Sequence, residues 1–311
     1  MALAMLKARP VPPDLPAFAS LPVQRVSLLH PQELVAVHIS GLLDARQMPL
    51  VCITGFHRNM SDFADFLELF RRQMGADAPI VLIDLPGRGR STDRRHAIDY
   101  SSPADARDLS AVLSALAIER AVFLGQGHGG QVIMALASSR PTIIAGAVLI
   151  DAGPVAAPRG LVRLRSNLRD LEGLRSETGL RAMFRRMLSA DYPGQREAVL
   201  DRLAGRTHFL DKRKRVRPLF DPALLKFLDG FQFDDVFEAQ WPLFHALDHA
   251  PLMLMRTQLT DLLHRDVFDE MLRRRPDAEG FIVEEQATPA LLSRPQDVAN
   301  IIEFYARIAK G

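Results

Sequence analysis

The chain has almost no cysteine and no long apolar run. Cys52 is the only cysteine among 311 residues, so no disulfide can form within the chain. It stands in the apolar run 50–53, where a buried structural thiol is expected rather than a reactive one. The longest apolar stretches, such as 132–137 and 145–150, fall far short of the ~20 residues that cross a bilayer. These absences predict a cytoplasmic protein with no transmembrane helix.

A strong charge of one sign is also lacking. The formal net charge of +2 is too small to indicate nucleic acid or a membrane surface as a partner. Prolines interrupt the first twenty residues, and no continuous apolar segment there ends in a cleavage site. We therefore expect residues 1–20 to form a loose N-terminal arm rather than a secretion signal. The composition, 48% hydrophobic and 24% charged, is typical of a globular protein with a large core.

The motifs of metal and nucleotide sites are missing as well. The histidines are scattered, and neither an H-x-x-x-H motif nor a cysteine pair occurs, so no metal is expected. The glycine-rich turn 125–130 lacks the Lys-Ser/Thr ending of a phosphate-binding loop. We expect neither a nucleotide nor any other cofactor.

Short β-branched runs alternate with amphipathic helical patterns through most of the chain. The runs that predict strands are 50–54, 80–84, 121–125, 146–151, 251–256 and 280–285. Those that predict helices are 60–73, 102–116, 131–138, 265–275 and 296–308. Residues 24–30 and 34–40 resemble a hairpin at one edge. Such alternation predicts a mostly parallel sheet with helices on both faces.

The alternation stops between about residues 155 and 247, where the sequence is helical, interrupted by prolines and rich in arginine. Because strands on both sides of this segment belong to one sheet, we expect an insertion rather than a second domain. The predicted division is an arm over 1–20, a core over 21–155 and 247–311, and a helical cap over 156–246.

Three glycine-containing turns follow predicted strands. The turn 125–130 reads Gly-Gln-Gly-His-Gly-Gly and leads from a strand into an apolar helix. An Asp-Leu-Pro-Gly-Arg-Gly-Arg-Ser turn occupies 84–91, and Thr-Gly-Phe-His-Arg-Asn occupies 54–59. In this order and spacing they resemble the nucleophile elbow, the D-x-x-G-x-G-x-S turn and the oxyanion loop of α/β-hydrolases. The resemblance covers the predicted core and implies the α/β-hydrolase fold of a capped, lipase- or esterase-like protein.

The same resemblance implies three catalytic positions. The serine nucleophile would stand at Gly127, an acid after strand 251–256, and a histidine after strand 280–285. Asp261 fills the acid position, but Thr288 is nearest the histidine position, and the last histidine of the chain is His264. Glycine has no attacking atom and threonine is no base near neutral pH, so a degenerate triad is expected. Glycine also relieves the strained backbone of an elbow.

Five residues near the elbow are candidate ligand contacts: Phe56, His57, Arg58, Gln126 and His128. The backbone N–H groups of Phe56 and His128 are expected to form an oxyanion hole. Arg58 could hold a carboxylate or be a surface arginine. The two histidines could act with Asp261 as an acid/base pair. Alternatively, His128 merely lines the pocket and His57 faces solvent or caps a helix. Asp261 itself could contact a ligand or be a relic that caps a helix.

Two features of the predicted cap leave alternatives open. The basic run 211–217 could dock an acidic partner or form a solvated, charge-balanced face. Seven aromatic residues could roof a hydrophobic pocket or form the core of the cap: Phe220, Phe227, Phe231, Phe233, Phe237, Trp241 and Phe244.

The sequence supports three functional hypotheses. The first is a non-catalytic pseudo-hydrolase that binds a small hydrophobic, carboxylate or ester-like ligand, or a regulatory protein partner. The second is an enzyme with a rebuilt site, such as a cofactor-free lyase or a weak ester hydrolase that uses His128, His57 or Asp261. The third is a structural subunit of a complex. Neither nucleic acid nor a membrane is expected as a partner.

Overall fold

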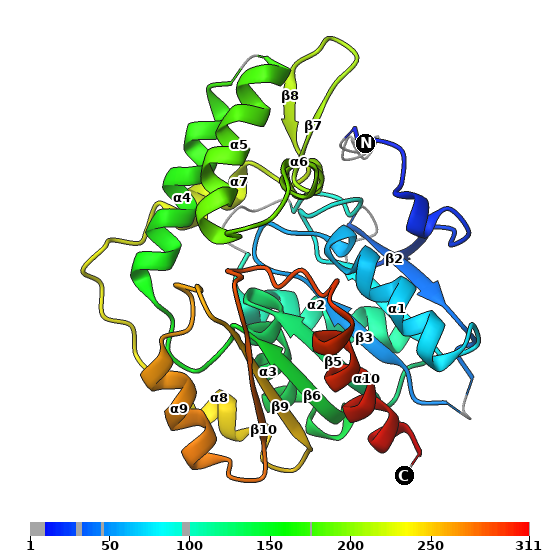
Figure 1. Cartoon of the computed structure of the whole chain (residues 1–311). Helices are drawn as coiled ribbons and strands as arrows, with labels where there is room; N and C mark the ends of the chain where they lie inside the picture. The colour runs from blue at the N-terminus through cyan, green and yellow to red at the C-terminus, as the bar shows by residue number, and fades with distance from the viewer. Residues whose placement is uncertain (1–9, 29–32, 45–46, 95–99, 175, 311) are drawn as a thin grey trace, which may run out of the picture.

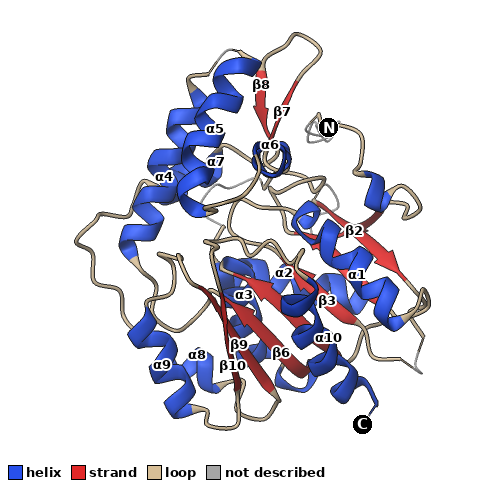
Figure 2. Ribbon diagram, viewed as in Figure 1, coloured by secondary structure: helices blue, strands red, loops and turns tan. Residues whose placement is uncertain are grey.

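A central eight-stranded sheet organises the molecule in the computed structural model, which describes residues 10–28, 33–44, 47–94, 100–174 and 176–310 (Figures 1 and 2). The strand order is β1-β2-β4-β3-β5-β6-β9-β10. The strands are β1 (Gln24–Ser27), β2 (Leu34–Ser40), β3 (Leu50–Ile53), β4 (Ile80–Asp84), β5 (Ala121–Gln126), β6 (Ile144–Ile150), β9 (Leu252–Thr257) and β10 (Glu279–Val283). Only β2 is antiparallel to its neighbours, β1 and β4, so the mostly parallel sheet is confirmed.

Helices cover both faces of the sheet. Those on the sheet are α1 (Ala64–Met74), α2 (Ser102–Ala115), α3 (His128–Ser139), α8 (Trp241–His245), α9 (Arg265–Arg274) and α10 (Pro295–Lys310). The inserted segment contains α4 (Pro158–Glu172), α5 (Glu177–Asp191), α6 (Glu197–Gly205) and α7 (Ala223–Leu228). One hydrophobic core joins the sheet to α1 and α10, and a second joins its other face to α2, α3, α8 and α9. Strands β3 to β6 are apolar along most of their length because both of their faces are buried.

The N-terminal segment is less loose than the sequence predicts. Its first nine residues lie outside the described part of the chain, but residues 10–20 pack on the core. Phe18 is 2% exposed and contacts the His38 ring, while the Asp14 carboxylate bonds His38 Nε2 at 2.9 Å and Arg90 Nε at 3.1 Å. The buried aromatic ring and these ion pairs hold the segment against β2. The predicted edge hairpin is present as β1 and β2, although residues 29 and 30 of its first strand are not described.

The insertion forms a helical cap over the carboxyl ends of the parallel strands (Figure 1). It consists of α4 to α7 and the two-stranded sheet of β7 (His208–Leu210) and β8 (Val216–Pro218), with its own apolar core. The turn after β4 pairs with the cap, because Gly89 N–H donates to Leu219 O and Asp221 N–H donates to Gly87 O, each at 2.7 Å. The cap is therefore bound to the core through backbone hydrogen bonds as well as through its chain connections.

Two aromatic residues predicted in the cap belong to the core instead. Trp241 and Phe244 lie on α8, which packs against α3, and Phe244 is 0% exposed. Helix α8 carries its apolar side chains toward the sheet because the chain re-enters the core before residue 241. The exact boundaries of the cap remain a prediction.

Among the described residues, no helix combines the length and the apolar character that crossing a bilayer requires.

Candidate functional site

Gly127 occupies the sharp corner between β5 and α3. Its φ of 51° and ψ of −114° are values that residues other than glycine adopt at a cost. Its N–H donates to Ile150 O at 2.7 Å, which ties the corner to β6. A Cβ at this position would meet only Leu262 Cδ1 at 3.6 Å and Thr288 Cγ2 at 3.9 Å, which are ordinary contacts. The backbone thus has the conformation of an elbow nucleophile, with room for a small side chain directed at residue 288.

The neighbouring positions must be glycine because a side chain there would clash with the surrounding backbone and side chains. A Cβ at Gly129 would lie 2.3 Å from Ile53 O, and one at Gly130 would lie 2.3 Å from Ala152 Cβ. A Cβ at Gly125 would lie 2.6 Å from the backbone of Gly129. These glycines let α3 pack closely on the sheet, as expected for an elbow.

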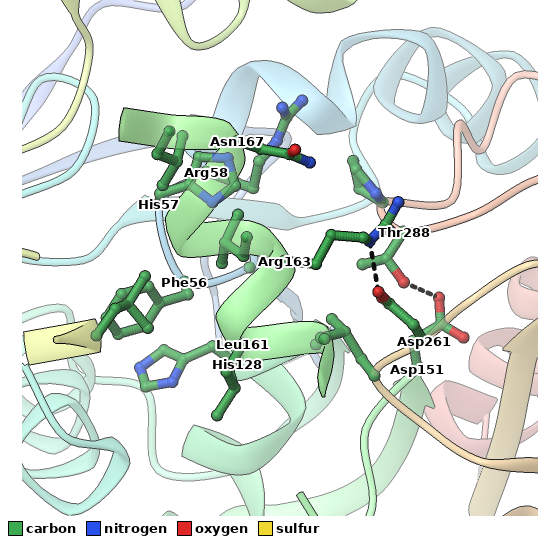
Figure 3. A pocket seen from close by; sticks show the side chains of 18 of the residues that line it. Phe56, His57, Arg58, His128, Asp151, Leu161, Arg163, Asn167, Asp261 and Thr288 are labelled. Carbon is green, nitrogen blue, oxygen red and sulfur yellow. Dashed lines mark hydrogen bonds and ion pairs between the residues drawn. The ribbon is translucent and has the colours of Figure 1, made fainter. Parts of the chain in front are cut away.

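Thr288 lies across from Gly127 and is bound to a carboxylate that the sequence analysis missed. Its Oγ1 donates to Asp151 Oδ2 at 2.5 Å, a contact drawn as a dashed line in Figure 3. Asp151 follows β6 directly and also accepts hydrogen bonds from Thr257 N–H at 2.7 Å and Thr257 Oγ1 at 2.6 Å. It is 2% exposed, with a φ of 50°, and burial raises its pKa to about 6. A strained, buried acid beside the histidine position has the features of a functional residue.

Asp261 lines the same cavity but points to the cap. Its Oδ2 accepts from Arg163 Nε at 2.5 Å (Figure 3). Arg163 Nη1 also donates to Asp191 at 2.9 Å. The residue of this loop that contacts Thr288 is Thr260, with 2.9 Å between the two hydroxyl oxygens. Geometry therefore directs Asp151 and Thr260 at the histidine position, and Asp261 at Arg163.

Backbone donors remain at the elbow. Within the described part of the chain, no hydrogen bond from the N–H of Phe56 or of His128 to another residue is present. His128 is the first residue of α3, whose dipole adds positive potential there. Arg88 fixes the oxyanion loop, because its Nε donates to Phe56 O at 2.7 Å. These amide N–H groups can donate hydrogen bonds to a carbonyl oxygen without help from any particular side chain.

The His128 ring has its own carboxylate partner, Asp105, and not Asp261. His128 Nε2 lies 2.7 Å from Asp105 Oδ2, while Arg88 and Arg94 bind the same carboxylate at 3.0 and 2.6 Å. Burial raises the pKa of Asp105, but Arg88 and His128 outweigh it and hold that pKa below the usual range. Burial lowers the pKa of His128 against the opposing effect of Asp105, so a neutral imidazole is expected near pH 7.

His57 and Arg58 both line the cavity from the oxyanion loop. Arg58 is 7% exposed rather than at the surface, and its Nε and Nη2 bind the Asp62 carboxylate at 2.7 and 2.5 Å. It is thus not the surface arginine of the first alternative, and its guanidinium is paired with Asp62; a role in holding a ligand carboxylate stays a prediction. His57 packs edge-on against Phe220, and burial holds its pKa well below the usual value.

Gln126, the remaining candidate contact, ends β5 and is 1% exposed. Neither its amide oxygen nor its amide nitrogen has a partner among the described residues, and it is absent from the cavity wall. The geometry gives it no contact with a ligand in this cavity.

A cavity of about 360 Å³ lies between the elbow and the cap. Gly127, His128, Asp151 and Thr288 line its core side, and apolar side chains of the cap line the rest. The latter include Leu161, Leu164, Leu168, Phe184, Met187, Phe227 and Phe231. An apolar chamber with a few polar groups at one end is the usual form of a small-molecule site.

Of the cap aromatics, Phe227 and Phe231 therefore do line the cavity, while Phe233 is 57% exposed. The basic run lies at the tip of the β7–β8 hairpin, where the Asp211 carboxylate accepts from Arg215 Nε and Arg217 Nε. This pairing is what a charge-balanced face requires. Docking of a partner there stays a prediction.

Comparison with known proteins places this geometry in a family. A family model described as "Alpha/beta hydrolase family" matches residues 50–301. The chain belongs to this family. A crystal structure of an alpha/beta hydrolase from Novosphingobium aromaticivorans superposes with a TM-score of 0.79 at 25% identity, over 93% of this chain and 99% of that one. The α/β-hydrolase fold predicted from the three turns is thereby confirmed.

Two curated relatives are a hydrolase and an esterase by name. A 3-hydroxybutyrate-oligomer hydrolase of Cupriavidus necator is 25% identical over 264 residues, which are 82% of this chain and 87% of the relative. Esterase YbfF of Escherichia coli is 33% identical over 107 residues, only 34% of this chain and 39% of the relative. The names describe those proteins, whereas the chemistry of this family member depends on its own site.

Proposed function

We propose that this α/β-hydrolase family protein binds a small, mainly apolar molecule with a carbonyl or ester-like group, and does not cleave it through a serine nucleophile. The observation that carries the proposal is Gly127, which has the backbone of an elbow nucleophile but no side chain to attack with. Thr288, bound to Asp151, supplies no base for such an attack. The oxyanion-type amides and the apolar cavity, by contrast, are suited to binding a carbonyl compound.

The ester- and hydrolase-type names of the relatives support an acyl-like ligand, because the amide donors and the cavity are the parts that binding alone requires. A purely structural subunit is less well supported. Side chains would then be expected to fill the space between cap and elbow, but about 360 Å³ is open there.

The test is turnover of p-nitrophenyl acetate, butyrate and octanoate by the purified protein, together with labelling by a fluorophosphonate probe. We expect no rate above buffer and no labelling, because no serine stands at the elbow. Saturable hydrolysis by the native protein would overturn the proposal.

One observation favours a second candidate, an enzyme with a rebuilt site. The Asp105 carboxylate orients the His128 ring at the cavity wall, and an imidazole oriented by a carboxylate is a common general base. His128→Ala in the same assay separates the two candidates. If the native protein turns over an ester and His128→Ala does not, the rebuilt-site enzyme is correct.

A further inference from the structure

The cations on the cavity wall are already paired with carboxylates. Arg58 binds both oxygens of Asp62, and Arg163 binds Asp261 and Asp191. Each guanidinium would have to leave a carboxylate before it could bind a second one. Such an exchange gains little, because the carboxylate left behind becomes unpaired near the cavity.

Asp151 has the opposite character, since it is an acid without an ionic partner. Its oxygens accept from Thr257 and Thr288, and no Lys, Arg or His nitrogen of the described residues lies within ion-pair distance. Arg256, whose charge lowers the pKa of Asp151, donates its hydrogen bonds to the backbone carbonyl oxygens of Leu263, Thr257, Gln258 and Thr260. Burial raises the pKa of Asp151 to about 6, so this acid is mostly ionised at pH 8.

The histidines do not balance this charge. Burial lowers the pKa of both His57 and His128, which leaves their rings neutral at pH 8. Asp151 is therefore a negative charge next to the elbow that forms no salt bridge with any described residue. Two contacts connect it to residue 127: Thr288 Oγ1 lies 2.5 Å from Asp151, and Thr288 Cγ2 would lie 3.9 Å from a Cβ at Gly127.

We infer that the site selects an uncharged carbonyl compound, a ketone or an ester, and discriminates against the free carboxylate of the same shape. This inference rests on the proposed function, and names the class of ligand that the cavity takes. The amide N–H groups of Phe56 and His128 donate to the carbonyl oxygen in either case. The second oxygen of a carboxylate would bring a negative charge toward Asp151, in surroundings where charges interact more strongly than in water.

The experiment compares 2-nonanone with octanoate, which share a seven-carbon chain and differ by a methyl group against a charged oxygen. Binding of each is measured by isothermal titration calorimetry at pH 8 to the native protein and to Asp151→Asn. Glu303→Gln, on the exposed face of α10, is the control that removes the same charge far from the cavity. A ketone cannot be hydrolysed, so turnover does not complicate the measurement.

We expect the native protein and Glu303→Gln to bind 2-nonanone at least about tenfold more tightly than octanoate. In Asp151→Asn the ratio of the Kd of octanoate to the Kd of 2-nonanone should approach one, mainly because octanoate binds more tightly. Octanoate binding to the native protein as tightly as the ketone, or an unchanged ratio in Asp151→Asn, would overturn the inference while leaving the proposed function intact. Binding of neither molecule to any of the proteins would overturn the proposed function, and the inference with it.

If Asp151→Asn does not fold, a second variant tests the selection against a carboxylate. Asp261→Asn removes one of the two carboxylates that hold Arg163, so octanoate should gain affinity and 2-nonanone should not. An equal change for both molecules would contradict selection by charge.

Discussion

Residue 127 combines a serine-compatible position with the absence of a serine. Its Cβ would make only ordinary contacts, and the oxyanion-type amides lie beside it, so the missing groups are the nucleophile and its base. Triad members act as a unit, which means that restoring one of two lost members restores little. The site should therefore respond to a pair of substitutions rather than to either one.

We predict that Gly127→Ser/Thr288→His hydrolyses p-nitrophenyl butyrate at least about a hundredfold faster than either single variant. A histidine at 288 would lie beside Asp151, whose Oδ2 now accepts a hydrogen bond from Thr288 Oγ1 at 2.5 Å. The serine should also lower the free energy of unfolding by about 1–3 kcal/mol, because φ at 127 is positive. Initial rates and urea unfolding measure the two effects.

The structure and the sequence pattern assign different acids to such a rebuilt triad: the structure assigns Asp151, and the sequence pattern assigns Asp261. Adding Asp151→Asn to the double variant should abolish the gained activity, whereas adding Asp261→Asn should leave most of it, because Asp261 contacts Arg163. The reverse result would show that Asp261 turns to face a histidine at 288 and that the observed contact of Asp151 is not the relevant one.

Asp151 should also make stability depend on pH. Its pKa is raised to about 6 by burial, so the folded state favours its protonated form. Its contribution to stability is therefore complete below the pKa of the unfolded chain, near pH 4, and is lost as the pH rises through about 6. Relative to Asp151→Asn, the native protein should lose up to about 3 kcal/mol of unfolding free energy between pH 4 and 7.

Urea unfolding of both proteins at several pH values tests this expectation. The other aspartates with raised pKa values, Asp84, Asp108 and Asp191, are common to both proteins and cancel in the difference. A stability difference that does not change with pH would show that Asp151 keeps an ordinary pKa in the fold.

At the scale of elements, the strands and helices of the core were predictable, because their signal is local. The apolar runs 50–53 and 80–84 became β3 and β4, and the glycine turn 125–130 became the corner between β5 and α3. The acid was not predictable in the same way. The order of catalytic residues in α/β-hydrolases assigns the acid to the loop after β9. The contact between Asp151 and Thr288 joins residues 137 positions apart, and no local pattern indicates it.

Prediction from local patterns also failed for segments that could pack either in the cap or on the core. Trp241 and Phe244 have the aromatic character of the cap, yet a short helix carries them onto α3. Phe18 and Asp14 stand in a proline-rich segment that reads as a loose arm, and their partners in β2 lie about twenty residues away. Long-range partners of this kind are not visible in composition or periodicity.

An arginine of helix α4 forms an ion pair with the core. Arg163 Nε binds Asp261 of the core loop, and its Nη1 binds Asp191 of α5. The Arg163 side chain is 44% exposed, so the ion pairs should contribute at most about 1 kcal/mol. We predict that Arg163→Met accelerates hydrogen exchange of α4 amides by about fivefold, because α4 opens more easily from the core.

Arg169→Met is the matched control for this measurement. Arg169 also lies on α4 and is exposed, but it pairs with Asp229 within the inserted segment. Exchange in this variant should match that of the native protein. If both variants accelerate exchange equally, Arg163 acts through the stability of the helix and not through its contact with the core.

At the scale of the whole molecule, core and cap both line the cavity, and the apolar cluster of the cap also includes Tyr100, which precedes α2 of the core. A ligand that fills it contacts the elbow on one side and the helices of the cap on the other. Its binding free energy should therefore stabilise cap and core together. Stabilisation by a ligand that binds only the folded state reaches about 2.7 kcal/mol at one hundred times its Kd.

We predict that 2-nonanone raises the Tm of the native protein and slows hydrogen exchange in α4 and α3 alike, while Leu164→Trp removes both effects. Leu164 lies on the cavity wall of α4, and an indole there occupies the space of the ligand. Leu164→Met nearly conserves volume and serves as the control that should still respond. A rise in Tm that persists in Leu164→Trp would mean that the ligand binds outside the cavity. Slowed exchange in α4 but not in α3 would mean that the ligand binds the cap without reaching the elbow.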